Sequence, residues 1–450
     1  MSEDEIRIER DELFAPAIDE ALAREHAGRE RIVADAAPVS PIRRLMLNSL
    51  VYLPLAAVLA ALVSWILLEP KIVDLPIVSG EIILVNAEPL GVAPGFISLT
   101  VGPNEVLVHT TATKLERGAE GQPAFASVDS LKIGDTIEAA GLGEGGRVLA
   151  AAIRPTDRAE PRGKVERSLW PLALLFPLTA ALIAFGLLFS EGITTRNWLR
   201  MTERSLLGGF LAALFALLAF LPAGIIFKIS QSVLEAQDGE NLLIVTVKEL
   251  SVTHFLIYAA CRSAAWACIG AATGVGMNLV RSTRTQLRNS VIGGALGGAL
   301  GGLFFDPIDR FFGASMFTDS ATSRLVGLLA VGLSIGIFVA LVERLARDAW
   351  LRVRTGPLAG KSFILYKTPT IVGSSPQSDV YLYKDAEIDP SHASIHRVGT
   401  VYEVEDMGTR MGTSVGGNKV RRRRLVSGDQ IVIGSTLLDF EERQKRTPRN

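Results

Sequence analysis

Two groups of charged residues are the first candidates for chemistry in this chain. Four consecutive arginines, Arg421, Arg422, Arg423 and Arg424, form a basic run near the C-terminal end. A guanidinium keeps its positive charge and binds phosphates and carboxylates through paired hydrogen bonds. We therefore expect this run, read as a loop, to attract either an anionic membrane lipid surface, at about 1 kcal/mol per arginine, or an acidic partner.

The second group surrounds Arg262, which lies within a long apolar run. A charge near the middle of a bilayer costs at least about 2.5 kcal/mol when it has no partner. Asp306 and Asp309, at the end of another apolar run, are the expected counter-charges. The arrangement predicts either a structural ion pair or a path for an ion or solute, and the second alternative would make the protein a channel or transporter.

The other residue types argue against several functional classes. The sequence shows no cluster of metal ligands and no nucleophile with a base, and Cys261 and Cys268 are expected to be packing residues on one helix face. The stretch GPLAGKS at 356–362 is one residue short of a phosphate-binding loop and follows no buried strand. The formal net charge of −1 provides no overall field for nucleic acid. We expect no metal, no cofactor, no nucleic-acid partner and no enzymatic activity.

Long apolar runs are the elements that must position these residues. The chain has 450 residues, of which 48% are hydrophobic and 21% charged, which predicts several domains around a membrane region. A helix needs roughly 20 apolar residues to cross the hydrocarbon core. Six runs are near that length, one upstream and five within residues 168–343: 45–68, 169–189, 206–227, 252–279, 291–308 and 325–342.

The joints between these runs predict their orientation. Arginines follow the second, fourth and sixth runs, whereas acidic residues follow the third and fifth. Short basic joints stay on the cytoplasmic side, so six crossings leave both termini in the cytoplasm. The sequence thus predicts a multi-pass protein of the inner or plasma membrane, with residues 1–44 as an acidic cytoplasmic tail.

The fifth run contains glycines at every fourth position in two rows, from Gly293 to Gly302. Such rows allow a neighbouring helix backbone to approach closely. Gly332 and Gly336 in the sixth run offer a matching groove. Tight packing within one subunit and a pore or homo-oligomer contact both remain open.

Two further regions read as β structure. Residues 70–160 contain about five short runs of alternating apolar and polar residues, typical of a small barrel similar to the OB type, on the extracytoplasmic side. The segment 357–443 has the same alternation, broken by Gly, Pro, Asp and Ser turns.

The C-terminal segment resembles a forkhead-associated (FHA) domain. The matching stretches are KSFILYKTPTIVGSSPQSDVYL, DPSHASI, YEVEDMGTRMGTSVGG and RLVSGDQIVIGSTLLDFEER. The resemblance implies a sandwich of two antiparallel sheets whose loops at one end bind phosphothreonine peptides. The layout also resembles a group of bacterial FHA-containing multi-pass membrane proteins.

The resemblance assigns roles to individual positions, several of which depart from the family. Gly373, His392 and Gly412 match family scaffold positions, and Thr409 stands where the family usually has serine. Ser374 replaces the phosphate-binding arginine, Asp389 replaces a serine, and Met411 replaces an asparagine. Serine lacks the arginine fork, and at about 4 Å a carboxylate repels a phosphate by roughly 1–4 kcal/mol.

Ordinary phosphothreonine binding is therefore not expected. Arg410 and the basic run could compensate by rebuilding a phosphate pocket, although lipid or acidic-partner binding is the favoured interpretation. The sequence predicts a polytopic helical membrane bundle with an extracytoplasmic barrel and a C-terminal all-β FHA-like sandwich. It favours a signalling scaffold with a cytoplasmic protein partner, phosphorylated or not, over a channel or transporter regulated by its head.

Overall fold

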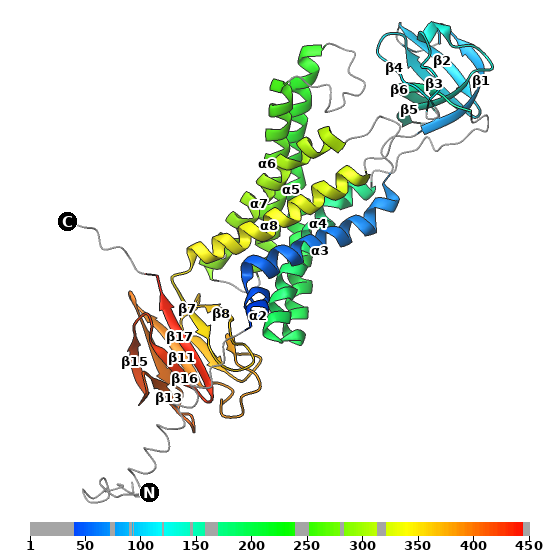
Figure 1. Cartoon of the computed structure of the whole chain (residues 1–450). Helices are drawn as coiled ribbons and strands as arrows, with labels where there is room; N and C mark the ends of the chain where they lie inside the picture. The colour runs from blue at the N-terminus through cyan, green and yellow to red at the C-terminus, as the bar shows by residue number, and fades with distance from the viewer. Residues whose placement is uncertain are drawn as a thin grey trace, which may run out of the picture.

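The computed structural model describes residues 40–72, 77–89, 92, 94–118, 121–144, 147–157, 170–238, 252–279, 283–312 and 321–443. It places a helical bundle between two β domains (Figure 1). We call the domain of residues 77–155 the barrel and that of residues 349–442 the head. The two lie at opposite ends of the bundle (Figure 1). The predicted tail before residue 40 and the segment 239–251 lie outside the described residues.

Within the described residues, the bundle contains one short helix and six long ones. They are α2 (Pro41–Met46), α3 (Ser49–Leu68), α4 (Trp170–Thr195), α5 (Trp198–Asp238), α6 (Val252–Asn278), α7 (Arg284–Phe312) and α8 (Ala321–Ala346). The helix α5 continues well past the expected end of its span at 227. Polar side chains begin two of the helices, since Ser40 caps α2 and Asn48 caps α3 by accepting backbone hydrogen bonds.

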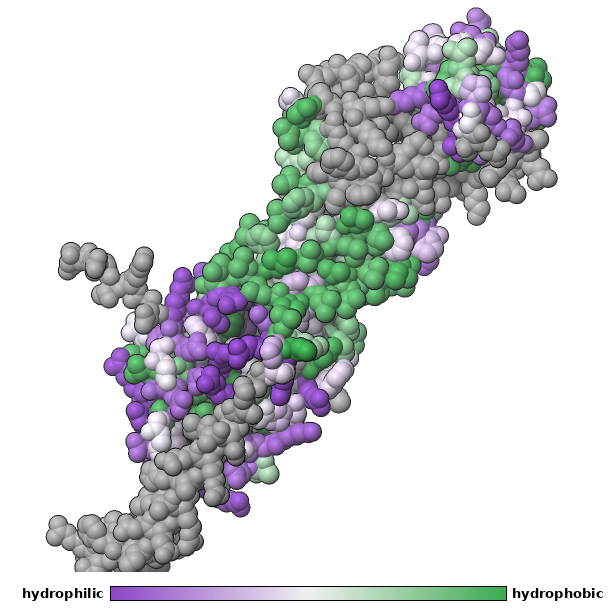
Figure 2. Space-filling view, in the orientation of Figure 1, coloured by the Kyte–Doolittle hydropathy of each residue, from purple (hydrophilic) through white to green (hydrophobic). Residues whose placement is uncertain are grey.

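Five helices in the described part are long and apolar enough to cross a membrane. These segments are Ser49–Lys71, Ala173–Thr195, Met201–Ile226, Phe255–Asn278 and Arg324–Ala346. The surface over the helices is apolar between the two β domains (Figure 2). The expected fifth span is a helix, α7, but it is not among these five. Asp306 and Asp309 lie in α7, with side chains outside the described set.

Glycines of α7 are packed against helices of the same chain. A Cβ on Gly297 would lie 2.5 Å from Ile335 Cα of α8, and one on Gly298 would lie 2.3 Å from the carbonyl oxygen of Trp266 in α6. Both glycine rows thus mediate close packing within the chain, as one of the two alternatives predicted. Gly332 and Gly336 face α3 rather than α7, so the predicted match between them and the α7 rows is wrong.

An ion pair joins the barrel ends of α3 and α8. Arg324 Nε donates to Glu69 Oε2 at 3.0 Å, and its Nη2 contacts the other carboxylate oxygen. Both side chains are only about one-tenth exposed (11% and 10%). A paired geometry of this kind is the arrangement in which a buried ion pair satisfies both partners.

The barrel contains β1 (Ile77–Asn86), β2 (Phe96–Val101), β3 (Asn104–His109), β4 (Lys114–Leu115), β5 (Thr136–Glu144) and β6 (Arg147–Pro155). Five strands close because β3 pairs with β6, and the short strand β4 pairs with β6 further along the same edge. Alternate residues such as Leu99, Val106 and Ile137 fill the interior. His109 accepts turn hydrogen bonds from the amides of Thr111 and Ala112, which gives this ring a structural role.

The head is a sandwich of two sheets. Its strands are β7 (Ala349–Val353), β8 (Ser362–Ile364), β9 (Thr370–Gly373), β10 (Val380–Tyr381), β11 (Ala393–Val398), β12 (Val401–Asp406), β13 (Thr413–Val415), β14 (Asn418–Val420), β15 (Arg422–Leu425), β16 (Gln430–Ile433) and β17 (Thr436–Glu442). The sheet orders are β10-β9-β11-β12-β15 and β14-β13-β16-β17-β7-β8. Leu351, Tyr402, Ile431 and Phe440 are buried between them.

The head begins earlier in the chain than the sequence indicated. The strand β7 ends before residue 357, the expected boundary, yet its Leu351 lies opposite Phe440 of β17. Only residues 347 and 348 separate α8 from β7. The head is therefore joined to the bundle by a very short connection.

Candidate recognition site

The predicted recognition residues gather at one end of the head sandwich. Three loops meet there: 374–379 after β9, 382–392 before β11 and 407–412 after β12. The chain passes very close at Gly373, where a Cβ would lie 2.1 Å from the carbonyl oxygen of Pro390. Only glycine fits this contact, which explains why the motif has glycine at 373.

Ser374 is bound inward rather than presented to solvent. Its hydroxyl donates to the carbonyl oxygen of Ile388 at 2.7 Å, and its amide donates to the carbonyl of Asp389 at 3.0 Å. The side chain at this position therefore stabilises the neighbouring loop.

His392 is fully buried and connects two of the loops. Its Nδ1 accepts from the amide of Asp389 at 3.1 Å, so the neutral ring carries its proton on Nε2. Nε2 lies 3.1 Å from Thr409 Oγ1 and 3.3 Å from the carbonyl oxygen of Gly412. This is the scaffold position that the sequence predicted.

Asp406 organises the loop that follows β12, and sequence reasoning did not identify it. Its carboxylate accepts from the hydroxyls of Thr409 and Thr413, both at 2.8 Å, and from the amides of Gly408 and Thr409, both at 3.0 Å. Burial acts to raise the pKa of Asp406, but these hydrogen bonds outweigh it and leave the pKa below the usual range. The hydroxyl of Thr409 is thus held by Asp406 and His392.

Asp389 joins the second loop to the third. Its Oδ2 accepts from the backbone amide of Arg410 at 3.3 Å. The side chains of Arg410 and Met411 are exposed at the rim. The structure therefore brings all the positions that the resemblance singled out to one end of the head sandwich. The carboxylate of Asp389 lies among them.

The basic run lies on a strand, so its assignment to a loop was wrong. Arg422, Arg423 and Arg424 belong to β15, which pairs with β12 so that Glu405 lies opposite Arg422 and Glu403 opposite Arg424. This sheet edge is on the side of the head away from the helices (Figure 1).

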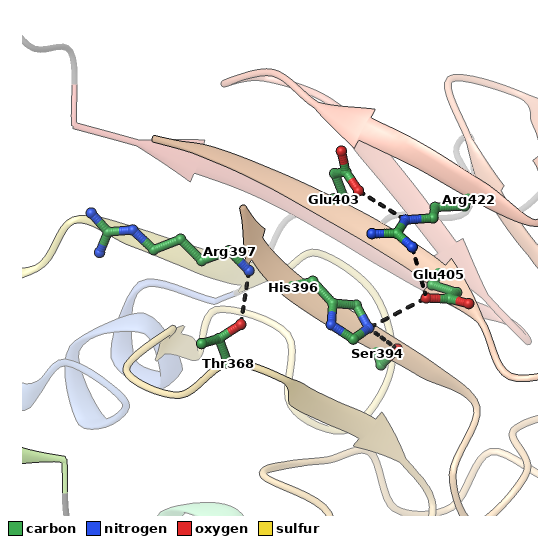
Figure 3. A network of polar contacts seen from close by, with 7 residues as sticks. All are labelled: Thr368, Ser394, His396, Arg397, Glu403, Glu405 and Arg422. Carbon is green, nitrogen blue, oxygen red and sulfur yellow. Dashed lines mark hydrogen bonds and ion pairs between the residues drawn. The ribbon is translucent and has the colours of Figure 1, made fainter. Parts of the chain in front are cut away.

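Carboxylates and a histidine accompany the basic run, as Figure 3 shows. Arg422 Nε donates to Glu403 Oε2 at 2.8 Å, and its Nη1 lies 3.8 Å from Glu405 Oε2. His396 Nε2 lies 3.4 Å from the same oxygen of Glu405. On the other face, Arg423 Nη1 donates to the carbonyl of Val415 at 2.9 Å. The positive charge of the run is partly neutralised because Glu403 and Glu405, two residues apart on β12, lie opposite Arg424 and Arg422 on β15.

The first recognition loop is also attached to the bundle. Asn197, between α4 and α5, donates from Nδ2 to the carbonyl oxygen of Pro376 at 2.8 Å. In the second loop, the centre of the Tyr383 ring lies 5.9 Å from the guanidinium of Arg196. The first loop is therefore bound to the helices at a point two residues from Ser374.

Two other stretches considered in the sequence lie away from the recognition loops. The lysine of GPLAGKS, Lys361, lies between β7 and β8, and no helix follows it as a phosphate-binding loop would require. Arg262 donates from Nη2 to the hydroxyl of Tyr258 one turn earlier in α6, at 2.7 Å. The predicted pairing of Arg262 with the aspartates of α7 falls on side chains outside the described residues. Among described residues no group of three or more metal-ligating side chains is found.

Comparisons with known proteins agree on the head. The family model for the FHA domain matches residues 370–434. An oxoglutarate dehydrogenase inhibitor of Corynebacterium jeikeium is 39% identical over 93 residues, which are 21% of this chain and 64% of that protein. The glycogen accumulation regulator GarA of Mycolicibacterium smegmatis is 36% identical over 93 residues, 21% of this chain and 58% of that protein.

Solved structures match over the same part. The FHA domain of the CT664 protein from Chlamydia trachomatis is 29% identical, covers 22% of this chain and 99% of that domain, and has a TM-score of 0.20. The chain spans less than two thirds of the length of these curated relatives, and the matches cover only its C-terminal fifth. Within that part, the matched residues and the sandwich agree, and the head of this chain is a forkhead-associated (FHA) domain.

Proposed function

We propose that this chain is a membrane-anchored signalling or scaffold protein that recruits a cytoplasmic protein partner through the loops of its FHA head. The FHA domain is a protein-recognition module, and the five apolar helices are suited to a membrane. The bundle provides the anchor, the head provides the binding site, and no catalytic step is assigned to either.

The placement of the joints supports a cytoplasmic head. Asn197, Asn278, Gln286 and Glu343, from the α4–α5 joint, the α6–α7 joint and the end of α8, all line one space together with head residues. The arginine-rich joints are therefore at the head end of the bundle. Short basic joints remain on the cytoplasmic side, so the head is cytoplasmic and the barrel, at the other end, is extracytoplasmic.

The recognition mode differs from phosphothreonine binding. The observation that carries this proposal is the geometry around Ser374, whose hydroxyl is bound to Ile388 while the carboxylate of Asp389 contacts the Arg410 amide. A phosphate at this end would meet a carboxylate and would lack the arginine fork. Arg410 and Met411 remain at the rim to contact a partner that is not phosphorylated.

Peptide titration of the full-length chain in lipid nanodiscs tests the recognition mode. We expect the wild type to bind phosphothreonine peptides no better than their unphosphorylated forms. The double variant S374R/D389S should gain a phosphate preference of about tenfold, since it restores a charged donor and removes a like charge. R354Q, at an exposed arginine directly after β7, serves as the matched control and should gain nothing.

Two results would contradict the proposal in different ways. A phosphothreonine preference in the wild type that R410Q abolishes would restore ordinary FHA recognition through Arg410. A partner captured from cytoplasmic extract that binds equally well to a chain lacking the head would remove the adaptor role.

A further inference from the structure

A large polar cavity lies between the head end of the bundle and the head. Its volume is about 640 Å³, within the roughly 300–1,000 Å³ typical of ligand sites. The bundle contributes residues from α2 to α8, and the head contributes β7, β8 and the end of the first recognition loop. The cavity therefore belongs to neither part alone.

Positive charge predominates in the described lining. Lys367 and Asp379 form an ion pair at 2.8 Å and neutralise each other. The other cationic side chains are Arg44, Arg204, Arg344, Arg347, Arg352 and Lys361, and the remaining carboxylates are Glu191, Glu343 and Glu441. Apart from the Lys367–Asp379 pair, cationic side chains outnumber carboxylates two to one, so the cavity favours an anion.

Lys361 forms the buried wall of the cavity, with only 5% of its surface exposed. Its Nζ donates to Thr194 Oγ1 at 2.9 Å and to the hydroxyl of Tyr52 at 3.2 Å, in α4 and α3. Burial lowers the pKa of Lys361 to about 8, while the carboxylates of Glu191 and Glu343 oppose that change. The ammonium thus remains largely charged at neutral pH.

Tyr366 supplies a neutral donor to the same lining. Burial, together with the charges of Glu343 and Glu191, raises the pKa of Tyr366. Its hydroxyl therefore keeps its proton at physiological pH.

Two arginines at the end of α8 line the cavity close to one another. The guanidinium of Arg347 lies 3.5 Å from the centre of the Trp350 ring, which holds it in place. Burial lowers the pKa of Arg347, and the neighbouring charge of Arg344 lowers it further. An anion between the two guanidinium groups would relieve this repulsion and accept hydrogen bonds from both.

The cavity lies between the bundle and the head, and at this junction the apolar helical surface gives way to the polar surface of the head (Figure 2). With the membrane placement proposed above, this is the level of the lipid headgroups. Basic pockets between membrane helices on the cytoplasmic side bind phosphorylated headgroups.

We propose that this cavity binds the phosphate of an anionic lipid headgroup, held by Arg344 and Arg347 and closed at its inner wall by Lys361. Both the bundle and the head contribute lining residues, so an occupied site stabilises the docked head. Free phosphate shares the same chemistry, but the position at the end of the apolar surface favours the lipid.

Lipid retention by the full-length chain tests the site. Wild-type protein is reconstituted in nanodiscs of phosphatidylcholine with a minor share of phosphatidylglycerol, then extracted, and bound lipid is measured by native mass spectrometry. The site variant is R344Q/R347Q. The matched control is R284Q/R288Q, which removes two exposed arginines at the same end of the bundle but outside the cavity lining.

We expect wild type and control to retain phosphatidylglycerol in preference to phosphatidylcholine, and the site variant to retain about tenfold less. R344K/R347K keeps the charge without the fork and should lose only part of the retention. Circular dichroism confirms that the variants remain folded. Equal retention by the site variant and the wild type, or an equal loss in the control, would overturn the proposal.

A second measurement separates the lipid from free phosphate. Inorganic phosphate added to the extracted protein should displace little phosphatidylglycerol, because the lipid also gains from its acyl chains. Binding of inorganic phosphate by a protein that retains no phosphatidylglycerol would overturn the lipid assignment. A chain that fails to reconstitute at all would instead contradict the membrane placement, so the two failures are distinguishable.

Discussion

Asn197 of the helical bundle donates a hydrogen bond to the backbone carbonyl of Pro376 in the head, at 2.8 Å across 179 residues of sequence. Pro376 lies in the first recognition loop, which begins at Ser374. The bundle therefore restrains the loop through which the head is expected to meet its partner. Under the proposed function, partner binding at that loop is therefore coupled to docking of the head.

Replacing Asn197 with alanine should loosen this loop. A neutral hydrogen bond contributes about 0.5–1.5 kcal/mol, so amide hydrogen exchange of residues 375–378 should accelerate several-fold in N197A. The control is T202A, whose hydroxyl bonds only within its own helix, to the carbonyl of Trp198. If exchange in the loop is the same in both variants, the hydrogen bond does not restrain it.

Lys361 should make stability depend on alkaline pH. Its pKa is about 8 in the folded protein, against 10.5 for a free lysine. Between these values the unfolded chain binds more protons, so stability should rise with pH across this window, by up to about 3 kcal/mol. Melting of the wild type in detergent should therefore shift upward from pH 8 to pH 10.

The variant K361M isolates this effect, because it has no ammonium to titrate. The melting temperature of the wild type relative to that of K361M should therefore increase as the pH rises from 8 to 10. K367M, in the exposed ion pair with Asp379, serves as the control. Parallel pH profiles for wild type and K361M would rule out a buried charged lysine.

Asp406 should be critical for the recognition loop. In the wild type, hydroxyls and backbone amides donate to both carboxylate oxygens of Asp406. In D406N an NH2 group replaces one of these oxygens, so it faces donors and cannot accept their hydrogen bonds. Loss of hydrogen bonds to a charged group costs roughly 1.5–3 kcal/mol. Limited proteolysis should cut residues 407–412 faster in D406N than in D429N, a second head aspartate in a turn.

The lowered pKa of Asp406 adds a pH dependence to the same loop. A carboxyl whose pKa is lowered by folding stabilises the fold when the pH is above the pKa that the group has in the unfolded chain. This contribution is lost as the pH falls below about 4. The acid sensitivity of the loop should be present in the wild type and absent in D406N. Equal acid sensitivity in both proteins would assign it to another group.

Gly298 should be intolerant of any side chain. In G298A the new Cβ would meet the carbonyl oxygen of Trp266 at 2.3 Å, so α6 and α7 must separate. Overpacking of this kind typically costs 1–3 kcal/mol, and the melting temperature in detergent should fall. G224A, in α5, has no atom within 4 Å of its new Cβ and should leave the melting temperature unchanged. Similar melting of the two variants would contradict close packing of α7.

Much of the architecture could be predicted because it depends on local patterns. Span length indicates bundle helices, and alternation of apolar and polar residues indicates the strands of the barrel and the head. The FHA motifs identified the head, because a buried ring at His392 and a close backbone contact at Gly373 need those residue types. The basic run was wrongly assigned to a loop. Four consecutive arginines show no alternation of apolar and polar residues, so their sequence does not distinguish a strand from a loop.

The sequence by itself determined the three kinds of domain, the apolar helices and the departures from the FHA recognition pattern. Only the tertiary structure decided that Glu403 and Glu405 accompany Arg422 on a sheet edge, that Asn197 restrains the first loop, and that Lys361 closes a cavity shared by bundle and head. The physical reason is the separation along the sequence over which each kind of interaction acts. Periodicity and turn chemistry act between near neighbours, whereas these contacts join side chains far apart in sequence through the packing of whole domains.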